Sequence, residues 1–261
     1  MKPRLLLLLL LTFLAVACSR APQKDAPLRV GMELNFPPFE VKTPDGTPSG
    51  VSVELAQELG VFLGRKVAIV DMPFDALIPS LKTDKIDLII SSMTSTPERA
   101  KSIDFSDPYV STGLAILAGK NTNIQSVADL DLSERRIAVK KGTTAHIYVS
   151  QNLKKTQPLV FDKDGTAVLE VAQGKADAFI YDQMSILQHS LRNPDTTRAL
   201  LAPFQKESWA IGIRKGNDPL RNDVNRFLAD FKARKGFDAL GDKYCGEHKK
   251  AFAALGIPFY F

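Results

Sequence analysis

Short apolar runs alternate with longer amphipathic stretches along the first third of the chain. The runs 28–32, 66–71 and 86–90 have the length and composition of buried strands, whereas 52–63 repeats its apolar residues at helical spacing. A second helix is expected to open at Met72 and to end near Leu81. The resulting order, strand-helix-strand-helix-strand, is typical of an α/β sheet whose strands are mainly parallel.

The same alternation restarts further along the chain and predicts a second α/β unit. Loops are expected at 33–40 and 103–109. Strands are expected at 113–118, 136–139, 159–161, 177–181 and 208–214, and helices from about 144 to 154 and at 166–173, 182–191 and 220–234, the last ended by Gly236. A helix around 243–254 precedes an apolar tip, 257–261, that we expect to pack against the body of the protein.

Three polar or aromatic stretches follow the first three predicted strands. They are Glu33–Phe39, Met72–Phe74 and Ser91–Arg99. Ligands of parallel sheets bind beyond the carboxyl ends of the strands, so the three stretches are expected to converge on one rim. In the first stretch two successive prolines display Phe36 and Phe39, of which one is expected to be buried and the other to face a cleft.

The stretch Ser91–Arg99 has the chemistry of an anion site. Thr96 is a candidate N-cap, and Pro97 suits the first helical position, so free backbone N–H groups and hydroxyls are expected where the strand ends. Arg99 can add a bidentate guanidinium. Taken alone, the stretch is better explained by an ordinary capped helix with a surface arginine. The convergence of the three strand ends favours the site.

The second unit offers matching features. The turn 140–144, rich in lysine, glycine and threonine, follows a strand and precedes a helix, so its N–H groups can meet an anion. Asp182 lies at another strand end. It is expected to cap the following helix, a role compatible with ligand binding.

The N-terminus has the pattern of an export signal. Lys2 and Arg4 precede an apolar segment, and the sequence up to Cys18 resembles a bacterial lipoprotein box. We therefore predict a lipoprotein signal peptide at 1–17, a tether at 18–27, and a protein in the periplasm or at the cell surface that is anchored to a membrane through lipid on Cys18. The alternative is an ordinary signal peptide cut nearby. Lipid on Cys18 would leave Cys245 without a partner, whereas a Cys18–Cys245 disulfide would tie the tether to the body.

Charge and composition narrow the function classes. The formal charge of +5 falls to +3 without Lys2 and Arg4, and no basic stripe interleaved with aromatics indicates a nucleic-acid surface. His146, His189 and His248 are scattered and form no metal-ligand pattern. No Ser/His/Asp grouping indicates a hydrolase. We expect no metal, no cofactor and no nucleic-acid partner.

Four motifs in order resemble the signature of the polar amino-acid-binding proteins of ABC importers, the bacterial extracellular solute-binding proteins of family 3. The motifs span 35–40, 91–109, 139–144 and 174–182, and the resemblance covers roughly 28–240. It implies the two-lobe periplasmic-binding-protein fold of type II, in which each lobe is a mixed sheet flanked by helices and two hinge strands join the lobes. Lobe 1 would be 28–112 plus 207–261 and lobe 2 would be 116–204, with crossovers near 112–115 and 204–207.

The resemblance also implies a role for nine residues. Arg99 takes the position that binds the ligand α-carboxylate, supported by Thr94, by the backbone near Ser92 and by Thr144 from the second lobe. Asp182 takes the position that pairs with the α-ammonium. Phe36 and Phe74 would sandwich the ligand side chain, and Glu33 and Lys140 would meet its far end.

The charges of Glu33 and Lys140 bear on which side chain is bound. Glu33 favours a cationic or amide side chain, whereas Lys140 favours an acceptor such as the glutamine carbonyl. The two can also neutralise each other, and a solvated charge at the cleft mouth is an equal reading of Lys140.

The implied function is capture of a basic amino acid or glutamine by a monomeric protein that delivers it to an ABC transporter permease. An exported cyclohexadienyl dehydratase on the same fold is the enzymatic alternative, with Glu33 as the candidate carboxylate. A third possibility is the sensor module of a receptor, which would have to dock to a separate membrane protein.

Overall fold

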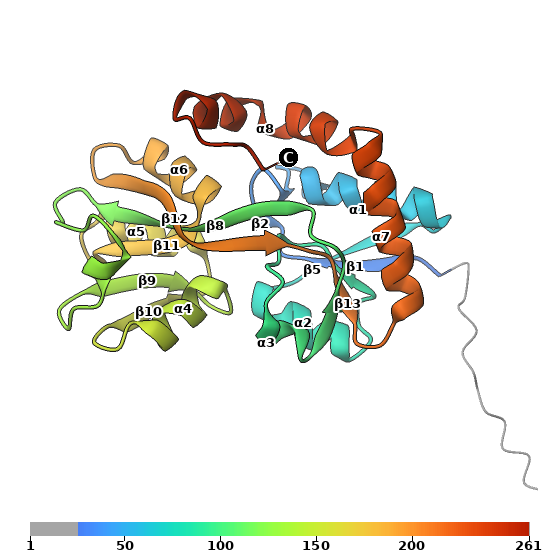
Figure 1. Ribbon diagram of the computed structural model, residues 1–261, viewed down its shortest axis with the longest axis horizontal. Coiled ribbons are helices and arrows are strands. Elements are labelled where there is room, and N and C mark those ends of the chain that lie inside the picture. Colours follow the sequence, from blue (N-terminus) through green and yellow to red (C-terminus); the bar gives the residue numbers. More distant parts are fainter. Residues whose placement is uncertain (1–25, 261) are drawn as a thin grey trace, which may run out of the picture.

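The computed structural model describes residues 26–260. The predicted signal peptide, Cys18 and nearly all of the predicted tether lie outside these residues. Figure 1 shows two α/β lobes joined by the long strands β8 (Val110–Gly119) and β12 (Thr197–Trp209). None of the helices in the described part of the chain is long and apolar enough to cross a membrane.

Lobe 1 contains a five-stranded mixed sheet. Its strand order is β5 (Val67–Asp71), β1 (Leu28–Met32), β6 (Leu88–Ile89), β13 (Gly212–Arg214), β7 (Ile103–Phe105). Strands β5, β1 and β6 are parallel, so their carboxyl ends share one edge, as the sequence predicts. Strand β13 is antiparallel to both of its neighbours. The helices of this lobe are α1 (Val51–Leu63), η1 (Phe74–Ala76), α2 (Leu77–Lys82), α3 (Pro97–Ala100), α7 (Asp218–Ala233) and α8 (Gly236–Ala254).

Lobe 2 contains a second five-stranded mixed sheet. Its strand order is β10 (Gln157–Phe161), β9 (Arg136–Lys140), β11 (Ala178–Asp182), β8, β12. The first three are parallel, and β8 is antiparallel to β11 and β12. The helices are η2 (Val127–Leu130), α4 (Thr144–Asn152), α5 (Asp164–Ala172) and α6 (Gln183–Arg192). A small separate sheet is formed by β2 (Asn35–Phe36), β3 (Glu40–Lys42) and β4 (Pro48–Ser49).

The two hinge strands are hydrogen-bonded to each other. Val110 pairs with Trp209, Thr112 with Glu207 and Leu114 with Gln205. A register shift follows between Leu200 and Gln205. The residues of the two predicted crossovers therefore lie opposite each other in one antiparallel ladder.

Each lobe has its own apolar core, but one cluster reaches across the hinge. Met184 and Leu187 of α6, in lobe 2, belong to the same buried cluster as the lobe 1 residues around α1 and α8. Tyr260 in the C-terminal tip is 8% exposed, and its ring centroid lies 6.0 Å from that of Trp209 and 5.5 Å from that of Phe252. The apolar tip packs against the body, as predicted.

Five local features differ from what the sequence predicted. Residues 33–40 and 103–109 were expected as loops but contain β2 and β7, and the predicted strand 208–214 is broken between β12 and β13. Strand β12 was not predicted. Gly236 begins α8 instead of ending α7, because Lys235 with φ 58° makes the break. A Cβ on residue 236 would lie 2.6 Å from the ring of Phe231.

Candidate functional site

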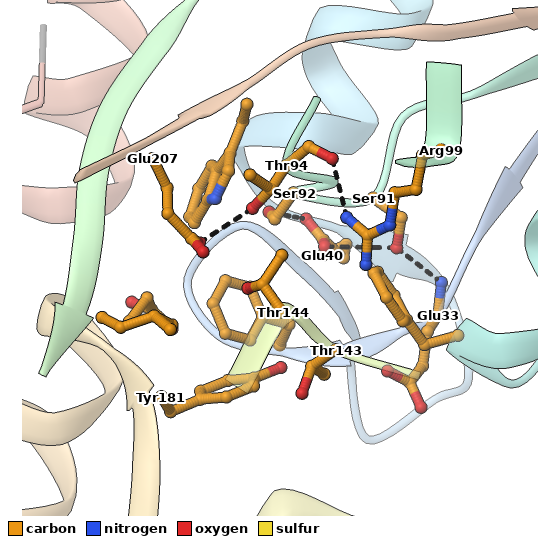
Figure 2. Close-up of a pocket in the computed structure, with 15 residues that line it drawn as sticks. Glu33, Glu40, Ser91, Ser92, Thr94, Arg99, Thr143, Thr144, Tyr181 and Glu207 are labelled. Atoms are coloured by element: carbon orange, nitrogen blue, oxygen red, sulfur yellow. Dashed lines mark hydrogen bonds between the residues drawn. The ribbon is translucent and has the colours of Figure 1, made fainter. Parts of the chain in front are cut away.

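A cleft between the lobes encloses about 450 Å³ of space, part of it open to solvent. Lobe 1 supplies residues that follow β1, β5 and β6. Lobe 2 supplies the start of α4 and the end of β11, and the hinge strands supply the rest. The lining comprises Glu33, Phe36, Glu40, Phe74, Ser91, Ser92, Thr94, Arg99, Leu114, Thr143, Thr144, Tyr181, Asp182, Glu207 and Trp209. Figure 2 shows many of these polar side chains around the cleft.

Arg99 is a buried cation in the wall of this cleft. The Thr96 hydroxyl caps α3 by accepting the Arg99 N–H at 3.1 Å, which confirms the predicted N-cap. The guanidinium donates to the carbonyl of Thr94 at 2.7 Å and to the carbonyl of Gly142, in lobe 2, at 3.0 Å. It is 7% exposed and forms no ion pair among the described residues. Burial lowers the pKa of Arg99 to about 10, with Glu207 opposing that shift. An anion in the cleft would supply the missing partner.

Asp182 is the corresponding buried anion from lobe 2. It ends β11 and caps α6, and one carboxylate oxygen, Oδ1, accepts the N–H groups of Met184 and Ser185, both at 3.1 Å. The residue is 7% exposed and lines the cleft. Burial raises the pKa of Asp182 to about 6, although the hydrogen bonds from Ser185 oppose the shift.

The turn after β9 brings lobe 2 against lobe 1. Thr143 caps α4 by accepting the His146 N–H at 3.3 Å, and Thr144 lies on the cleft surface. Gly142 has φ 74°, and a Cβ there would lie 3.0 Å from Asp75 of lobe 1. The glycine therefore allows the close approach that lets Arg99 reach the Gly142 carbonyl.

Lys140 differs from both sequence expectations. It does not line the cleft, and at 1% exposed it is not a solvated charge. Its ammonium donates to the carboxylate of Glu33, which does line the cleft. Burial raises the pKa of Glu33, and the Lys140 charge opposes that shift. The two charges neutralise each other across the lobe boundary, which the sequence left open.

Sequence reasoning missed the polar residues that surround this pair. Asp164 of α5 accepts a hydrogen bond from the Asn35 side chain at 3.3 Å, and its other oxygen lies 3.4 Å from His189 Nε2. Asn35 belongs to lobe 1, whereas Asp164 and His189 belong to lobe 2. A second polar contact between the lobes therefore lies beside the Glu33–Lys140 pair.

Glu40 lies beneath the serines of the motif and was also missed. It is 1% exposed and accepts hydroxyl hydrogen bonds from Ser52 at 2.6 Å, Ser92 at 3.1 Å and Ser91 at 3.4 Å. Ser92 has φ 48°, so the backbone turns sharply there. Burial raises the pKa of Glu40 to about 8. Glu40 belongs to the motif 35–40, but only the aromatic residues of that motif were considered as cleft residues.

The aromatic side chains divide as expected. Phe39 is fully buried, whereas Phe36 and Phe74 line the cleft. Two further rings, of Tyr181 and Trp209, were not predicted to lie there. Each has its centroid 5.8 Å from that of Phe36 in an edge-on arrangement. The ring centroid of Phe74 also lies 5.4 Å from the guanidinium carbon of Arg99.

Glu207 was missed because the strand that carries it was not predicted. It lies on β12 at the hinge and lines the cleft. Its carboxylate accepts the hydroxyl of Thr94 at 2.9 Å and the side-chain amide of Gln205 at 3.0 Å. In residues 26–260, no group of His, Cys, Asp and Glu side chains could hold a metal ion.

The structure thus brings eight of the nine proposed ligand residues to one cleft, with Lys140 directly behind it. Comparison with known proteins places this arrangement in a family. The L-cystine-binding protein TcyJ of Escherichia coli (strain K12) is 31% identical over 220 residues, which are 84% of this chain and 82% of that protein.

Two solved structures are similar throughout both lobes. An ancestral arginine-binding protein bound to arginine has a TM-score of 0.79 at 34% identity, covering 85% of this chain and 99% of that one. An ancestral amino acid-binding protein, described as a precursor of cyclohexadienyl dehydratase, has a TM-score of 0.76 at 35% identity, covering 84% and 95%. The model of the bacterial extracellular solute-binding proteins, family 3, matches residues 28–247, from the first strand of lobe 1 into α8, and the chain belongs to that family.

Proposed function

We propose that the protein captures a polar L-amino acid between its lobes and delivers it to the permease of an ABC transporter. The observation that carries this proposal is the placement of two buried, opposite charges on one cleft. Arg99 of lobe 1 has no anionic partner, and Asp182 of lobe 2 has no cationic one among the described residues. A zwitterion supplies both partners at once.

Each end of the zwitterion has a set of partners. The α-carboxylate would bind the guanidinium of Arg99, with the hydroxyls of Thr94 and Thr144 and the backbone near Ser92 as further donors. The α-ammonium would bind Asp182. Hydrogen bonds of this charge-assisted kind contribute roughly 1.5–3 kcal/mol each. Because the partners come from both lobes, a bound amino acid favours the closed arrangement of the hinge.

The far end of the cleft supports a polar ligand side chain. Phe36 and Phe74 would enclose its aliphatic part, and the Glu33 carboxylate would meet its polar end. The Lys140 charge that neutralises Glu33 favours an amide, whereas Glu33 itself favours a cation. The proposed ligands are therefore basic amino acids and glutamine. The similarity to a structure of an arginine-binding protein with arginine bound supports the basic class.

The test is calorimetric titration with the proteinogenic amino acids, ornithine, citrulline and cystine. We expect Arg99→Met and Asp182→Asn to lose binding while they keep the wild-type circular dichroism spectrum. Arg226→Met and Asp242→Asn remove exposed charges of α7 and α8 and should bind as the wild type does. Retained affinity in either cleft variant would contradict the assignment.

We also propose that the mature chain begins at a lipidated Cys18, that it acts as a monomer, and that the lobes divide at the predicted crossovers. The support is the sequence pattern before Cys18 and the ladder between β8 and β12. Labelled fatty acid should be incorporated into the wild type and not into Cys18→Ser. A wild type that incorporates none would exclude the lipid anchor.

We propose binding without catalysis, although one similar structure is described as a precursor of a dehydratase. Burial raises the pKa of the candidate general acid, Glu33, but the Lys140 ammonium donates to its carboxylate and competes with a leaving group for it. Incubation with prephenate and with arogenate should give no product, and turnover of either would overturn this part of the proposal.

A further inference from the structure

Glu207 is a buried carboxylate at the point where the hinge meets the ligand cleft. It pairs with Thr112 across the β8–β12 ladder and is 8% exposed. Figure 2 shows its carboxylate joined to the side chain of Thr94, whose carbonyl oxygen in turn accepts from Arg99. Glu207 is therefore one hydrogen bond away from the proposed carboxylate position.

The other cleft carboxyl groups already have partners that offset their burial. Glu33 is paired with Lys140, Glu40 accepts from three serine hydroxyls, and Asp182 accepts two backbone N–H groups. Glu207 accepts only the neutral donors Thr94 and Gln205, and no basic side chain of the described chain forms an ion pair with it. The positive charge of Arg99 attracts Glu207, but no hydrogen bond joins the two side chains.

The Thr94 hydroxyl cannot serve Glu207 and a ligand at the same time. A threonine hydroxyl has one hydrogen and donates to one acceptor. A ligand carboxylate that takes this hydrogen bond leaves Glu207 next to a second anion, in a site where solvent is largely excluded. That repulsion opposes the binding of a carboxylate ligand that has no α-amino group.

An α-ammonium group reverses the sign of this interaction. It has three N–H donors, whereas Asp182 already uses Oδ1 to cap α6. We propose that Glu207 is a specificity-determining residue, which takes the ligand carboxylate's place on Thr94 in the empty cleft and turns to the ligand ammonium in the filled one. This inference rests on the proposed function. Glu207 thereby makes the ammonium a requirement and excludes carboxylic acids of the same shape.

Pairs of ligands that differ only in the α-amino group test this directly. The probes are L-arginine with 5-guanidinopentanoate and L-glutamine with 5-amino-5-oxopentanoate. Calorimetry gives the ratio of the two Kd values within each pair for the wild type, Glu207→Gln and Glu207→Asp. Glu58→Gln, which removes a half-exposed carboxylate of α1 that pairs with Arg234, is the matched control.

We expect Glu207→Gln to reduce the preference for the amino acid about 10- to 100-fold, the size of one charge-assisted hydrogen bond. The amino acid should bind more weakly and the deaminated analogue more tightly. Glu207→Asp and Glu58→Gln should keep most of the wild-type preference. A structural role alone would weaken both probes together and leave their ratio unchanged.

An unchanged ratio in Glu207→Gln would overturn the inference and leave the amino-acid-binding function intact. Failure of the wild type to bind both amino acids would overturn the inference together with the ligand class on which it rests. If Glu207→Gln does not fold, Glu207→Ala with the same probe pairs carries the same expectation and the same refutation.

Discussion

Replacing Glu40 by glutamine should make the protein less sensitive to pH. Glu40 is 1% exposed and lies under the serines that form one wall of the cleft. Burial raises the pKa of this carboxyl from 4.5 to about 8, and the serine hydroxyls oppose the shift. At neutral pH the folded protein therefore carries a protonated Glu40, whereas the unfolded chain carries a carboxylate.

The size of the effect follows from that difference. Between pH 4.5 and about 8 the folded state binds one more proton than the unfolded state. The free energy of unfolding consequently falls as the pH rises, by about 1.4 kcal/mol per pH unit and by about 5 kcal/mol over the whole interval. This contribution is complete below pH 4.5 and is lost as the pH passes the folded-state value of about 8.

The glutamine side chain does not ionise in this pH range. The free energy of unfolding of Glu40→Gln minus that of the wild type should therefore increase by about 4 kcal/mol from pH 5 to pH 8. A constant offset between acid and amide does not affect this slope. Urea unfolding at four pH values measures it, followed by the fluorescence of Trp209, the only tryptophan, and by circular dichroism. Two probes are needed because the lobes need not unfold together.

Glu98→Gln provides the control. Glu98 is 68% exposed in an ion pair with Lys101, so its substitution should leave the pH dependence of the wild type almost unchanged. Parallel curves for Glu40→Gln and the wild type between pH 5 and pH 8 would refute the reasoning, because they would mean that Glu40 ionises equally in the folded and unfolded states.

Three further outcomes follow from other parts of the site. Because burial raises the pKa of Asp182 to about 6, affinity for L-arginine or L-glutamine should fall about tenfold per pH unit below pH 6 in calorimetry; constant affinity from pH 7 to pH 5 would contradict its role. Lys140→Met frees the Glu33 carboxylate and should raise the affinity for L-arginine relative to L-citrulline, and an unchanged ratio of the two Kd values would show that Glu33 does not contact the ligand side chain. Tyr260→Ala should lower the free energy of unfolding by about 3 kcal/mol in thermal melts, since the ring is 8% exposed, whereas Leu255→Ala, at 54% exposed, should cost far less; equal effects would exclude a packing role for the tip.

The sequence predicted those parts of the fold that depend on local patterns. Strand β1 and helix α6 were located within a residue because their apolar periodicity and their boundaries are local. Thr96 was identified as an N-cap for the same reason. The two-lobe arrangement came from the motifs and their order, and the comparisons confirm it.

Elements that depend on distant partners could not be predicted in this way. Strand β7 has three residues and is defined by its pairing with β13, more than a hundred residues later. Strand β12 combines apolar residues with charges and Pro203, which an edge strand tolerates. Glu207 was lost with that strand, although it lies within the predicted crossover.

The charges of the cleft were the least predictable feature. Glu33 and Lys140 were both assigned to the ligand side chain, but whether two charges face a ligand or each other depends on how the lobes meet. The local sequence around Lys140 does not contain that information. The roles of the nine assigned residues stay predictions until ligands are measured.

The position of β13 has a consequence for how the chain acquires its structure. Lobe 1 is assembled from both ends of the sequence, and β13 lies between β6 and β7 in its sheet. Lobe 2 is nearly continuous in sequence, so it can be completed first as the polypeptide emerges from its N-terminus. Until residue 214 has emerged, β6 and β7 are two unpaired edges of an unfinished sheet, which is the kind of surface that aggregates. The last fifty residues are therefore needed to complete lobe 1 and its side of the cleft. Until they are in place, the unpaired strand edges allow self-association.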